Sequence, residues 1–279
     1  MFFQREVTMK ERIIMDTHVH VFPDKLKGKV LPKLGEIAKC PYHSDGTVSD
    51  TLEKMKGAGV AKFLCLHIAT NPKQQKSVNN FAVEVQNENP GVLCFGSVHP
   101  DSEEALSDLK MLKEKGIRGV KFHPDYQEFM VDDSRMEPIY AACEELGLIV
   151  AFHAGWDPLS PELIHCRPEA LRKVVEKHPE LKIIAAHLGG MKLADEVIGN
   201  LCHMDNVWFD TGFASCAFSP EDALRIIKAK GVDKIIFATD TPWSTVEAER
   251  EFLEGLDLSD EELDKIFYKN AFRLLGIKK

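Results

Sequence analysis

Short hydrophobic runs recur along the chain, and most of them are rich in β-branched residues. The runs cover residues 13–20, 60–69, 92–100, 117–124, 148–155, 181–190, 207–212 and 233–243. Their first residues lie 25 to 47 positions apart, which is near the roughly 30 residues that a strand and its crossover helix require. Because most of the runs are apolar on both faces, they are typical of buried parallel strands.

Amphipathic segments between the runs predict helices. These segments cover 102–115, 134–146, 168–177 and 259–275. In the first of them, Leu106, Leu109 and Leu112 share one face. Ser102 is placed to cap this helix and Gly116 to end it.

Eight such units predict the fold class α/β and the architecture of a closed (β/α)8 TIM barrel. The 279 residues suit one barrel, so we expect a single domain over residues 1–279 with a C-terminal helix. A doubly wound open sheet is the alternative, but no glycine-rich phosphate loop follows the first run.

Composition narrows the class of protein. With 35 basic and 44 acidic residues the formal net charge is −9, which argues against a non-specific nucleic-acid binder. No apolar run approaches the ~18 residues of a membrane span, and charges interrupt the opening residues, so we expect no signal peptide. The seven cysteines contain no C-x-x-C pair. We therefore predict a cytoplasmic protein.

Seven of the eleven histidines lie in the predicted strands or at their carboxyl ends. They are His18, His20, His67, His99, His123, His153 and His187. In a TIM barrel these strand ends surround the active site. The histidine positions therefore point to chemistry at the mouth of the barrel.

The first run, IIMDTHVH, places Asp16, His18 and His20 at alternate positions. Alternate residues of a strand face the same side, and two such imidazoles can bind one ion at a Zn–N distance of about 2.1 Å. A packed histidine beside a histidine that merely ends the strand is the other explanation.

Three further strand ends favour the metal interpretation. His153 in AFHAG, His187 in AAHLGG and Asp240 in FATDTPW each stand at the end of a different run. A buried aspartate after an apolar strand is costly unless it is paired or metal-bound. Taken singly, His153 or His187 is explained by packing, but the four sites together predict a metal centre.

This arrangement resembles the amidohydrolase superfamily: H-x-H on strand one, single histidines on strands five and six, and aspartate on strand eight. The phrases MDTHVHVFP, GVKFHP, AFHAG, AHLGG and ATDTPW are similar to one branch of it. That branch contains aminocarboxymuconate-semialdehyde decarboxylase, resorcylate decarboxylases and lactone hydrolases. The resemblance runs in consistent order from residue 13 to about residue 243.

The resemblance implies that His18, His20, His153 and Asp240 hold one divalent ion. Zinc is the first expectation, with Mn²⁺ or Fe²⁺ as alternatives because this ligand set discriminates weakly. Such an ion lowers the pKa of a bound water toward ~7. Asp240 would accept the proton of that water and His187 would stabilise the oxyanion. The predicted reaction is hydrolysis of a small carboxylated metabolite such as a lactone or amide.

Non-oxidative decarboxylation of an aromatic or muconate-type acid at the same site is the alternative. The resembling decarboxylases grip carboxylates with arginines, whereas residues 21–48 contain no arginine. Five lysines stand there instead: Lys25, Lys27, Lys29, Lys33 and Lys39. Arg167 is the candidate anion-binding residue, with an ordinary surface position as the other explanation.

Lys121 and His123 share one face of the fourth run. Some binuclear relatives carry a carboxylated lysine at the position of Lys121, but we favour a single ion, with Lys121 paired to an aspartate or binding substrate. Trp156 and Trp243 follow ligand-bearing strand ends and are predicted to line the substrate pocket, unless they anchor loops. The predicted substrate contacts are therefore Lys121, His123, Trp156, Arg167 and Trp243.

Two rival functions stay open at this stage. A TatD-like or phosphotriesterase-like binuclear phosphoesterase shares the ligand pattern, but the third and fourth runs end without a glutamate. A catalytically silent metal-binding barrel is the second rival. The predicted partner is a small-molecule substrate, with neither nucleic acid nor membrane, and a homodimer is the open alternative to a monomer.

Overall fold

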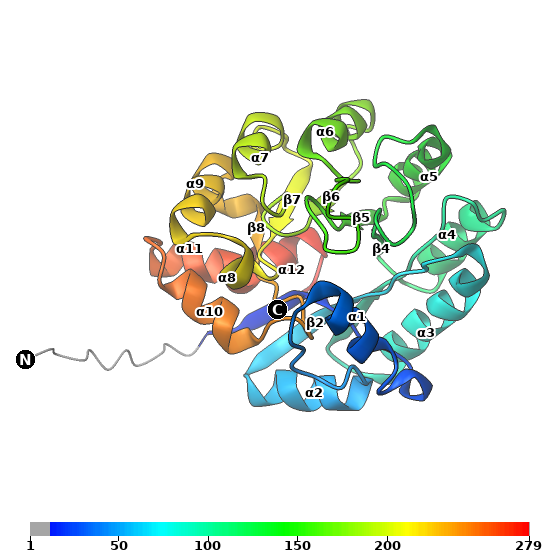
Figure 1. The fold of residues 1–279 in the computed structure, drawn as a ribbon, viewed down its shortest axis with the longest axis horizontal. Helices are drawn as coiled ribbons and strands as arrows, with labels where there is room; N and C mark the ends of the chain where they lie inside the picture. The colour runs from blue at the N-terminus through cyan, green and yellow to red at the C-terminus, as the bar shows by residue number, and fades with distance from the viewer. Residues whose placement is uncertain (1–11, 279) are drawn as a thin grey trace, which may run out of the picture.

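The computed structural model describes residues 12–278, in which a ring of parallel strands is surrounded by helices (Figure 1). The strands are β1 (Ile14–Val19), β2 (Val60–Leu66), β3 (Val92–Phe95), β4 (Gly119–Phe122), β5 (Ile149–Phe152), β6 (Ile183–Ala185), β7 (Val207–Asp210) and β8 (Ile235–Ile236). They pair in parallel in the orders β1-β2-β3 and β4-β5-β6-β7-β8. Isolated parallel bridges, Gly96 to Val120 and Val19 to Thr241, join the two sheets at both seams. The ring is therefore a closed barrel.

Most helices connect the strands on the outside of the ring (Figure 1). They are α1 (Val30–Ala38), α2 (Val48–Gly57), α3 (Gln75–Glu88), α4 (Ala105–Glu114), α5 (Glu137–Leu146), α6 (Pro168–Lys177), α7 (Ala194–Asn200), α8 (Ala214–Ala217), α9 (Pro220–Lys230), α10 (Val246–Glu254), α11 (Asp260–Asp264) and α12 (Asn270–Leu274). The 3-10 turns are η1 (Asp24–Leu26), η2 (Pro72–Gln74), η3 (Ser134–Met136) and η4 (Val232–Lys234), and η5 (Lys265–Lys269) is a π-helix.

Each of the eight predicted runs contains one strand, which confirms the prediction of an α/β barrel. The observed strands are shorter than the runs because the carboxyl end of most runs leaves the sheet and forms the barrel mouth. His153 and Asp240 lie in these extensions, after β5 and β8. The expectation of no signal peptide rests largely on residues 1–11, which lie outside the described residues. No helix of residues 12–278 has the length and apolar character needed to cross a membrane.

The C-terminal helices complete the seam between β8 and β1. The Phe237 N–H donates to the Ile266 carbonyl at 2.9 Å, and the Asn270 amide donates to the Ile235 carbonyl at 2.8 Å. The Thr17 N–H then donates to the Phe237 carbonyl at 2.9 Å. Because β8 is only two residues long, these bonds supply backbone partners that a longer strand would find in its neighbours.

Hydrophobic side chains fill the inside of the barrel at the end away from its mouth. This inner cluster consists of Met15, Leu64, Leu66, Phe95, Ile149, Ala151, Ile184, Ile236, Tyr268, Ala271, Leu274 and Leu275. Its members come from six strands and the C-terminal helix, so they meet inside the ring. A larger cluster packs the strands against the outer helices. The barrel is thus a packed core that leaves only its mouth for polar chemistry.

Candidate metal centre

The candidate centre is built where β1 and the segment after β8 run side by side. The Asp240 N–H donates to the His18 carbonyl at 2.9 Å, and the His20 N–H donates to the Thr241 carbonyl at 2.7 Å. Asp240 has a φ of 64°, in the left-handed region that costs a non-glycine residue about 1–3 kcal/mol. The two backbone bonds hold Asp240 in this conformation, and its carboxylate faces both imidazoles.

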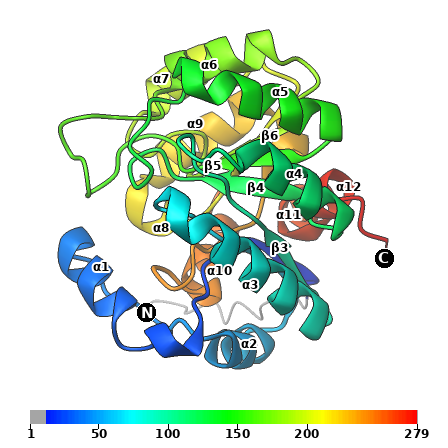
Figure 2. The same ribbon diagram turned by 90° about the vertical axis from the view of Figure 1, so that its right-hand side faces the viewer.

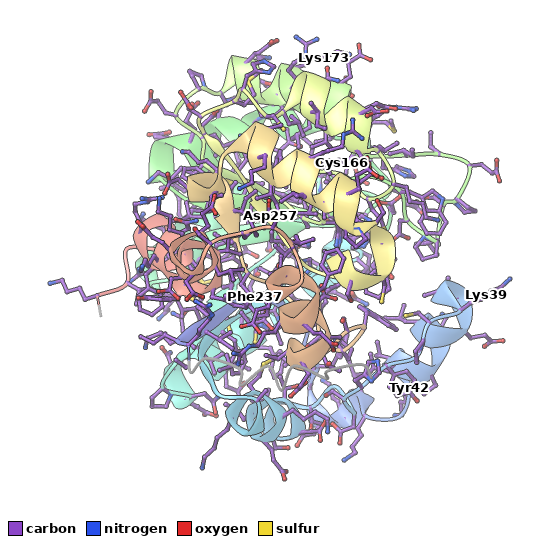
Figure 3. All side chains as sticks on the ribbon, turned by 90° about the vertical axis from the view of Figure 1, so that its left-hand side faces the viewer. Lys39, Tyr42, Cys166, Lys173, Phe237 and Asp257 are labelled. Atoms are coloured by element: carbon purple, nitrogen blue, oxygen red, sulfur yellow. The ribbon has the colours of Figure 1, made fainter. Side chains whose placement is uncertain are left out.

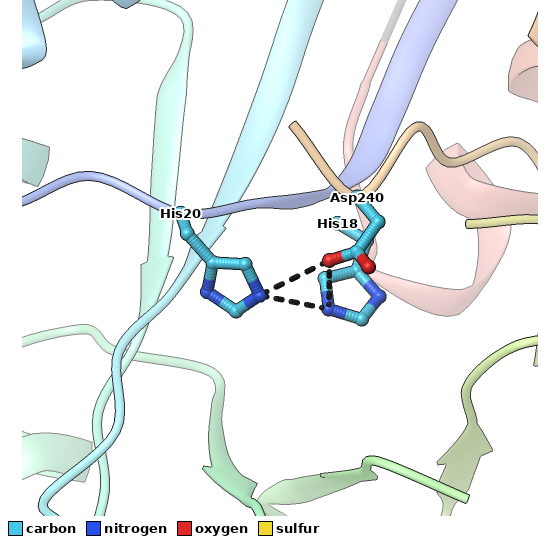
Figure 4. A group of neighbouring side chains, drawn as sticks. All are labelled: His18, His20 and Asp240. Atoms are coloured by element: carbon cyan, nitrogen blue, oxygen red, sulfur yellow. Dashed lines mark hydrogen bonds and ion pairs between the residues drawn. The ribbon is translucent and has the colours of Figure 1, made fainter. Parts of the chain in front are cut away.

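Three acceptor atoms converge at this point (Figure 4). The Nε2 atoms of His18 and His20 lie 3.2 Å apart, and Asp240 Oδ1 lies 3.3 Å and 3.2 Å from them. The Nδ1 of His20 donates to the Leu66 carbonyl at 2.9 Å, and the Nδ1 of His18 donates to the Asp210 carboxylate at 2.9 Å. Each neutral imidazole therefore presents an unprotonated Nε2. Three lone pairs in mutual contact suit a cation between them, and their separations of 3.2–3.3 Å are close to the roughly 3.4 Å between the ligands of a tetrahedral Zn²⁺.

The electrostatics keep His18 and Asp240 in their metal-binding forms. Burial, and then the charge of Lys121, hold the pKa of His18 well below its usual range, so this imidazole is neutral. Burial alone would raise the pKa of Asp240. The nearby imidazoles of His18, His20 and His187 have the opposite effect, which is larger in sum, so the pKa of Asp240 lies below its usual value. The Lys121 ammonium, fully buried on β4, lies 3.3 Å from His18 Nε2. Burial lowers the pKa of Lys121 to about 8.

Asp210, at the end of β7, is a functional residue that our sequence reasoning missed. Its Oδ2 accepts from His18 Nδ1, and its Oδ1 accepts from the N–H groups of His187 at 2.9 Å and Gly212 at 3.0 Å. A carboxylate behind a metal-binding histidine fixes the tautomer and orientation of the ring. Its position at the carboxyl end of a predicted buried strand was the available signal.

Asp16 does not reach the cavity with the two histidines of its strand. Its carboxylate accepts from the His18 N–H at 3.1 Å, the Thr239 N–H at 3.0 Å and the Thr239 hydroxyl at 2.6 Å. Register shifts in β1 interrupt the alternation on which the expectation of a shared face rested. Burial raises the pKa of Asp16 to about 7. Asp16 therefore ties β1 to the residues just before Asp240.

A second cluster lies across the mouth, on the β4 and β5 side. Asp157 Oδ2 lies 3.6 Å from His123 Nε2 and 3.5 Å from His153 Nε2. The two imidazoles stack with centroids 4.2 Å apart and an angle of 11° between the rings. Because each lone pair lies in its own ring plane and the two planes are nearly parallel, the Nε2 lone pairs point within separate planes and do not converge on one ion. The structure thus groups His153 with His123 and Asp157, not with His18, His20 and Asp240.

His187 lies behind His153 and is almost fully buried. Its Nδ1 donates to the Gly212 carbonyl at 2.9 Å, and its Nε2 lies 3.0 Å from His153 Nδ1. In the tautomer that these contacts require, His153 donates from Nδ1 and keeps a lone pair on Nε2. An oxyanion contact from His187, as predicted from the resemblance, would require one of these two bonds to break. His187 therefore orients His153 in this structure.

The metal candidate opens into a cavity of about 1340 Å³. Besides His18, His20 and Asp240, the predicted site residues that line it are Lys121, His123, His153, Trp156 and Trp243. The ring of Trp156 also stacks under Lys192 Nζ, 3.1 Å from its centroid. Arg167 does not line the cavity, because its guanidinium pairs with Glu196 at 2.8 Å on the surface. The structure thus brings together every predicted substrate contact except Arg167.

A closed parallel barrel with a His–His–Asp cluster at its mouth defines a (β/α)8-barrel enzyme of the metal-dependent class. Residues 15–277 match the family described as amidohydrolase, and the chain belongs to this family. A 4-sulfomuconolactone hydrolase from Rhizobium radiobacter is 26% identical over 246 residues, covering 82% of this chain and 75% of that protein. These matches place the chain among the metal-dependent hydrolases of the amidohydrolase superfamily, which act on small molecules.

Solved structures share the fold. An uncharacterized TIM-barrel protein from Bordetella bronchiseptica has a TM-score of 0.78 and 19% identity, covering 95% of this chain and 98% of that chain. A 5-carboxyvanillate decarboxylase from Novosphingobium aromaticivorans with bound manganese has a TM-score of 0.72 and 15% identity, covering 95% of this chain and 97% of that chain. At these identities the likeness concerns the barrel architecture.

Proposed function

We propose that this enzyme hydrolyses a lactone or amide bond in a small carboxylated metabolite, with one divalent ion, zinc first, as cofactor. The observation that carries the proposal is the convergence of three unprotonated acceptor atoms, from His18, His20 and Asp240, at the wall of a large cavity. These residues would hold the ion, and His153 would be the fourth ligand through its unpartnered Nε2.

The roles of the protein groups follow from their contacts. When bound, a divalent ion acts as a Lewis acid and lowers the pKa of water toward ~7. Asp240 uses Oδ1 toward the imidazoles, so Oδ2 is the atom that accepts the proton of the attacking water and returns it to the leaving group. The Asp210 carboxylate holds His18 in the tautomer that keeps Nε2 free. Trp156 and Trp243 line the space for the substrate.

Two observations favour hydrolysis over decarboxylation. The curated relative that matches the sequence is a hydrolase of a sulfonated lactone by its name. In addition, no arginine from residues 12–278 lines the cavity. Decarboxylation of an aromatic or muconate-type acid at the same centre is the second candidate, supported by the likeness of fold to the decarboxylases.

The test loads the protein with Zn²⁺ or Mn²⁺ and offers lactones, amides and aromatic carboxylic acids. Base consumption measures lactone hydrolysis, release of the amine measures amide hydrolysis, and release of CO₂ measures decarboxylation. We expect hydrolysis of a carboxylated lactone or amide, and loss of both metal and activity in His18→Ala and His153→Ala. Release of CO₂ without hydrolysis would assign the second function, and full metal loading with neither product would leave a metal-binding barrel.

Five predictions from the sequence remain part of this proposal. Four of them are the single domain over residues 1–279, a homodimer, the cytoplasmic location and zinc as the ion. The fifth, a binuclear site with a carboxylated Lys121, is the less favoured alternative to a single ion. Intact mass and metal content test for the carboxylated Lys121. One ion for each chain, without the added mass of CO₂, supports the mononuclear site.

A further inference from the structure

Three lysines that the metal centre does not use line the same cavity. Lys25, Lys29 and Lys33 belong to η1 and α1, the segment that follows β1. In Figure 2, α1 stands apart from the ring of helices, on the side to which the loop between β5 and α6 also extends. Figure 3 shows this segment from the opposite side, with Lys39 and Tyr42 at its outer end. The segment therefore overhangs the mouth of the barrel.

The three lysines together form the charged stripe of this segment. Lys25 lies in η1, Lys29 is the N-cap residue of α1 and Lys33 lies one turn further along α1. All three line the cavity, together with Leu26, Val30 and Leu34. All three side chains are exposed, and none of them forms an ion pair within residues 12–278. By contrast, Lys27 in the same segment pairs with Asp45 at 2.5 Å and does not line the cavity.

Lys29 and Lys33 lie one helical turn apart at the start of α1, where like charges repel each other. Lys29 also occupies the N-cap position of α1, whose first turn contains no acidic residue, and a cation there is unfavourable with the helix dipole. An anion in front of the stripe relieves both effects. The protein as a whole carries a net charge of −9, so an anionic molecule reaches the mouth against repulsion unless a local positive surface attracts it.

Resting on the proposed function, we infer that Lys25, Lys29 and Lys33 bind a second anionic group of the substrate, remote from the bond that is broken. The substrate is thus a small dianion: one end lies at the metal centre, and the other, a carboxylate or sulfonate, lies under α1. Glu84 and Glu88 line the cavity from α3, so this anionic end is confined to the α1 side. Ammonium groups suit this role as point charges without a required geometry.

The test compares two ligands that differ by one charge. Adipate is a six-carbon dicarboxylate, and monomethyl adipate keeps the chain length but has a single carboxylate. Calorimetric titration of the zinc-loaded protein measures the affinity for each. We expect about a tenfold preference for adipate, since each exposed ion pair contributes modestly. Added salt should reduce the preference, because exposed charges are screened.

Matched variants distinguish an effect of Lys25, Lys29 and Lys33 from an effect of positive charge anywhere in the segment. The triple variant Lys25→Met, Lys29→Met, Lys33→Met should lose the preference for adipate. The control Lys27→Met, Lys39→Met changes two lysines of the same segment that do not line the cavity, and it should keep the preference. A wild-type protein without a preference, or a triple variant that retains it, overturns the inference.

The binding experiment is independent of turnover. If the lysines select adipate while no lactone or amide is hydrolysed, the proposed function fails and the anion site stands. If hydrolysis occurs but the triple variant still prefers adipate, the proposed function stands and the anion site fails.

Discussion

The two walls of the barrel mouth carry the same residue types but differ in how the histidine nitrogens are hydrogen-bonded. On the β1 and β8 wall, His18 and His20 each have one nitrogen bound to a protein acceptor and the other in contact with Asp240. On the β4 and β5 wall, His123 Nδ1 and His153 Nε2 are buried without a hydrogen-bond partner, and the rings stack.

The difference shows that residue type alone does not make a metal site. Each wall offers two histidines and an aspartate within 4.8 Å. On the first wall, hydrogen bonds behind both rings fix the tautomers and direct the lone pairs to one point. On the second wall, His187 fixes the tautomer of His153, but the stacked rings do not direct their lone pairs to a common point. The second wall keeps a buried nitrogen, His153 Nε2, without a hydrogen-bond partner, which suits a fourth bond to an ion held by the first wall.

The largest expected effect comes from removing one histidine from each wall. His18→Ala should weaken Zn²⁺ binding by at least about 100-fold, because effects behind the ligands already reach 10- to 100-fold. His123→Ala should retain Zn²⁺ affinity within about threefold and lower kcat/KM. Competition with a chromophoric chelator measures both affinities. Equal losses in the two variants would remove the distinction between the walls.

The second effect tests the carboxylate behind His18. Asp210→Asn removes the charge that accepts from His18 Nδ1 and should weaken Zn²⁺ binding by about 10- to 100-fold. The same chelator competition measures it, with the thermal midpoint of the metal-free protein as a control for folding. Wild-type affinity in a folded Asp210→Asn protein would show that the ring is oriented without this carboxylate.

The third effect is a pH dependence on the first wall. Glu249, fully buried on α10, accepts from the Ser215 and Ser244 hydroxyls, each at 2.6 Å, and so ties the loops after β7 and β8. Burial raises its pKa to about 7 from an ordinary 4.5. The folded state therefore binds more protons between these values, and its stability falls as pH rises from 4.5 through 7.

Glu249→Gln removes this dependence. Urea unfolding of the metal-free protein at pH 5 and pH 8 should show the variant gaining about 1–3 kcal/mol relative to wild type between the two conditions. If the free energy of unfolding differs between variant and wild type by the same amount at pH 5 and at pH 8, Glu249 has the same pKa in the folded protein as in the unfolded chain.

The smallest effect concerns Arg167, outside both walls. Arg167→Ala breaks an exposed ion pair with Glu196 and should change the free energy of unfolding by no more than about 1 kcal/mol. Because the side chain does not line the cavity, KM for a carboxylated substrate should stay at its wild-type value. A marked increase in KM would return Arg167 to the role of an anion-binding residue.

The barrel could be predicted from the sequence because buried parallel strands are nearly continuous hydrophobic runs. The first and last residues of the helices were harder to predict from the sequence. The predicted helix over 102–115 begins at Ala105, and Leu106 is exposed while Leu109 and Leu112 are buried. Helix α1 was not predicted at all, since Pro32 and Gly35 interrupt it. Pro32 is tolerated because it lies in the first turn, where its missing N–H has no partner to lose.

The residues of the candidate centre could be predicted from the sequence for a similar reason. Polar residues at the ends of apolar strands stand out, and this identified His18, His20 and Asp240. The pairing of His153 with His187 and Asp157 depends on side-chain rotation, which no pattern along the chain records. Asp210 was missed because an aspartate after a strand also begins many ordinary turns.

The bond from Phe237 to the Ile266 carbonyl couples the metal centre to a part of the chain that supplies none of its ligands. Residues 265–274 lie far from the mouth of the barrel, yet they complete the seam that holds the segment carrying Asp240 against β1. A substitution that loosens their packing would therefore disturb the alignment of Asp240 without changing any residue that faces the ion.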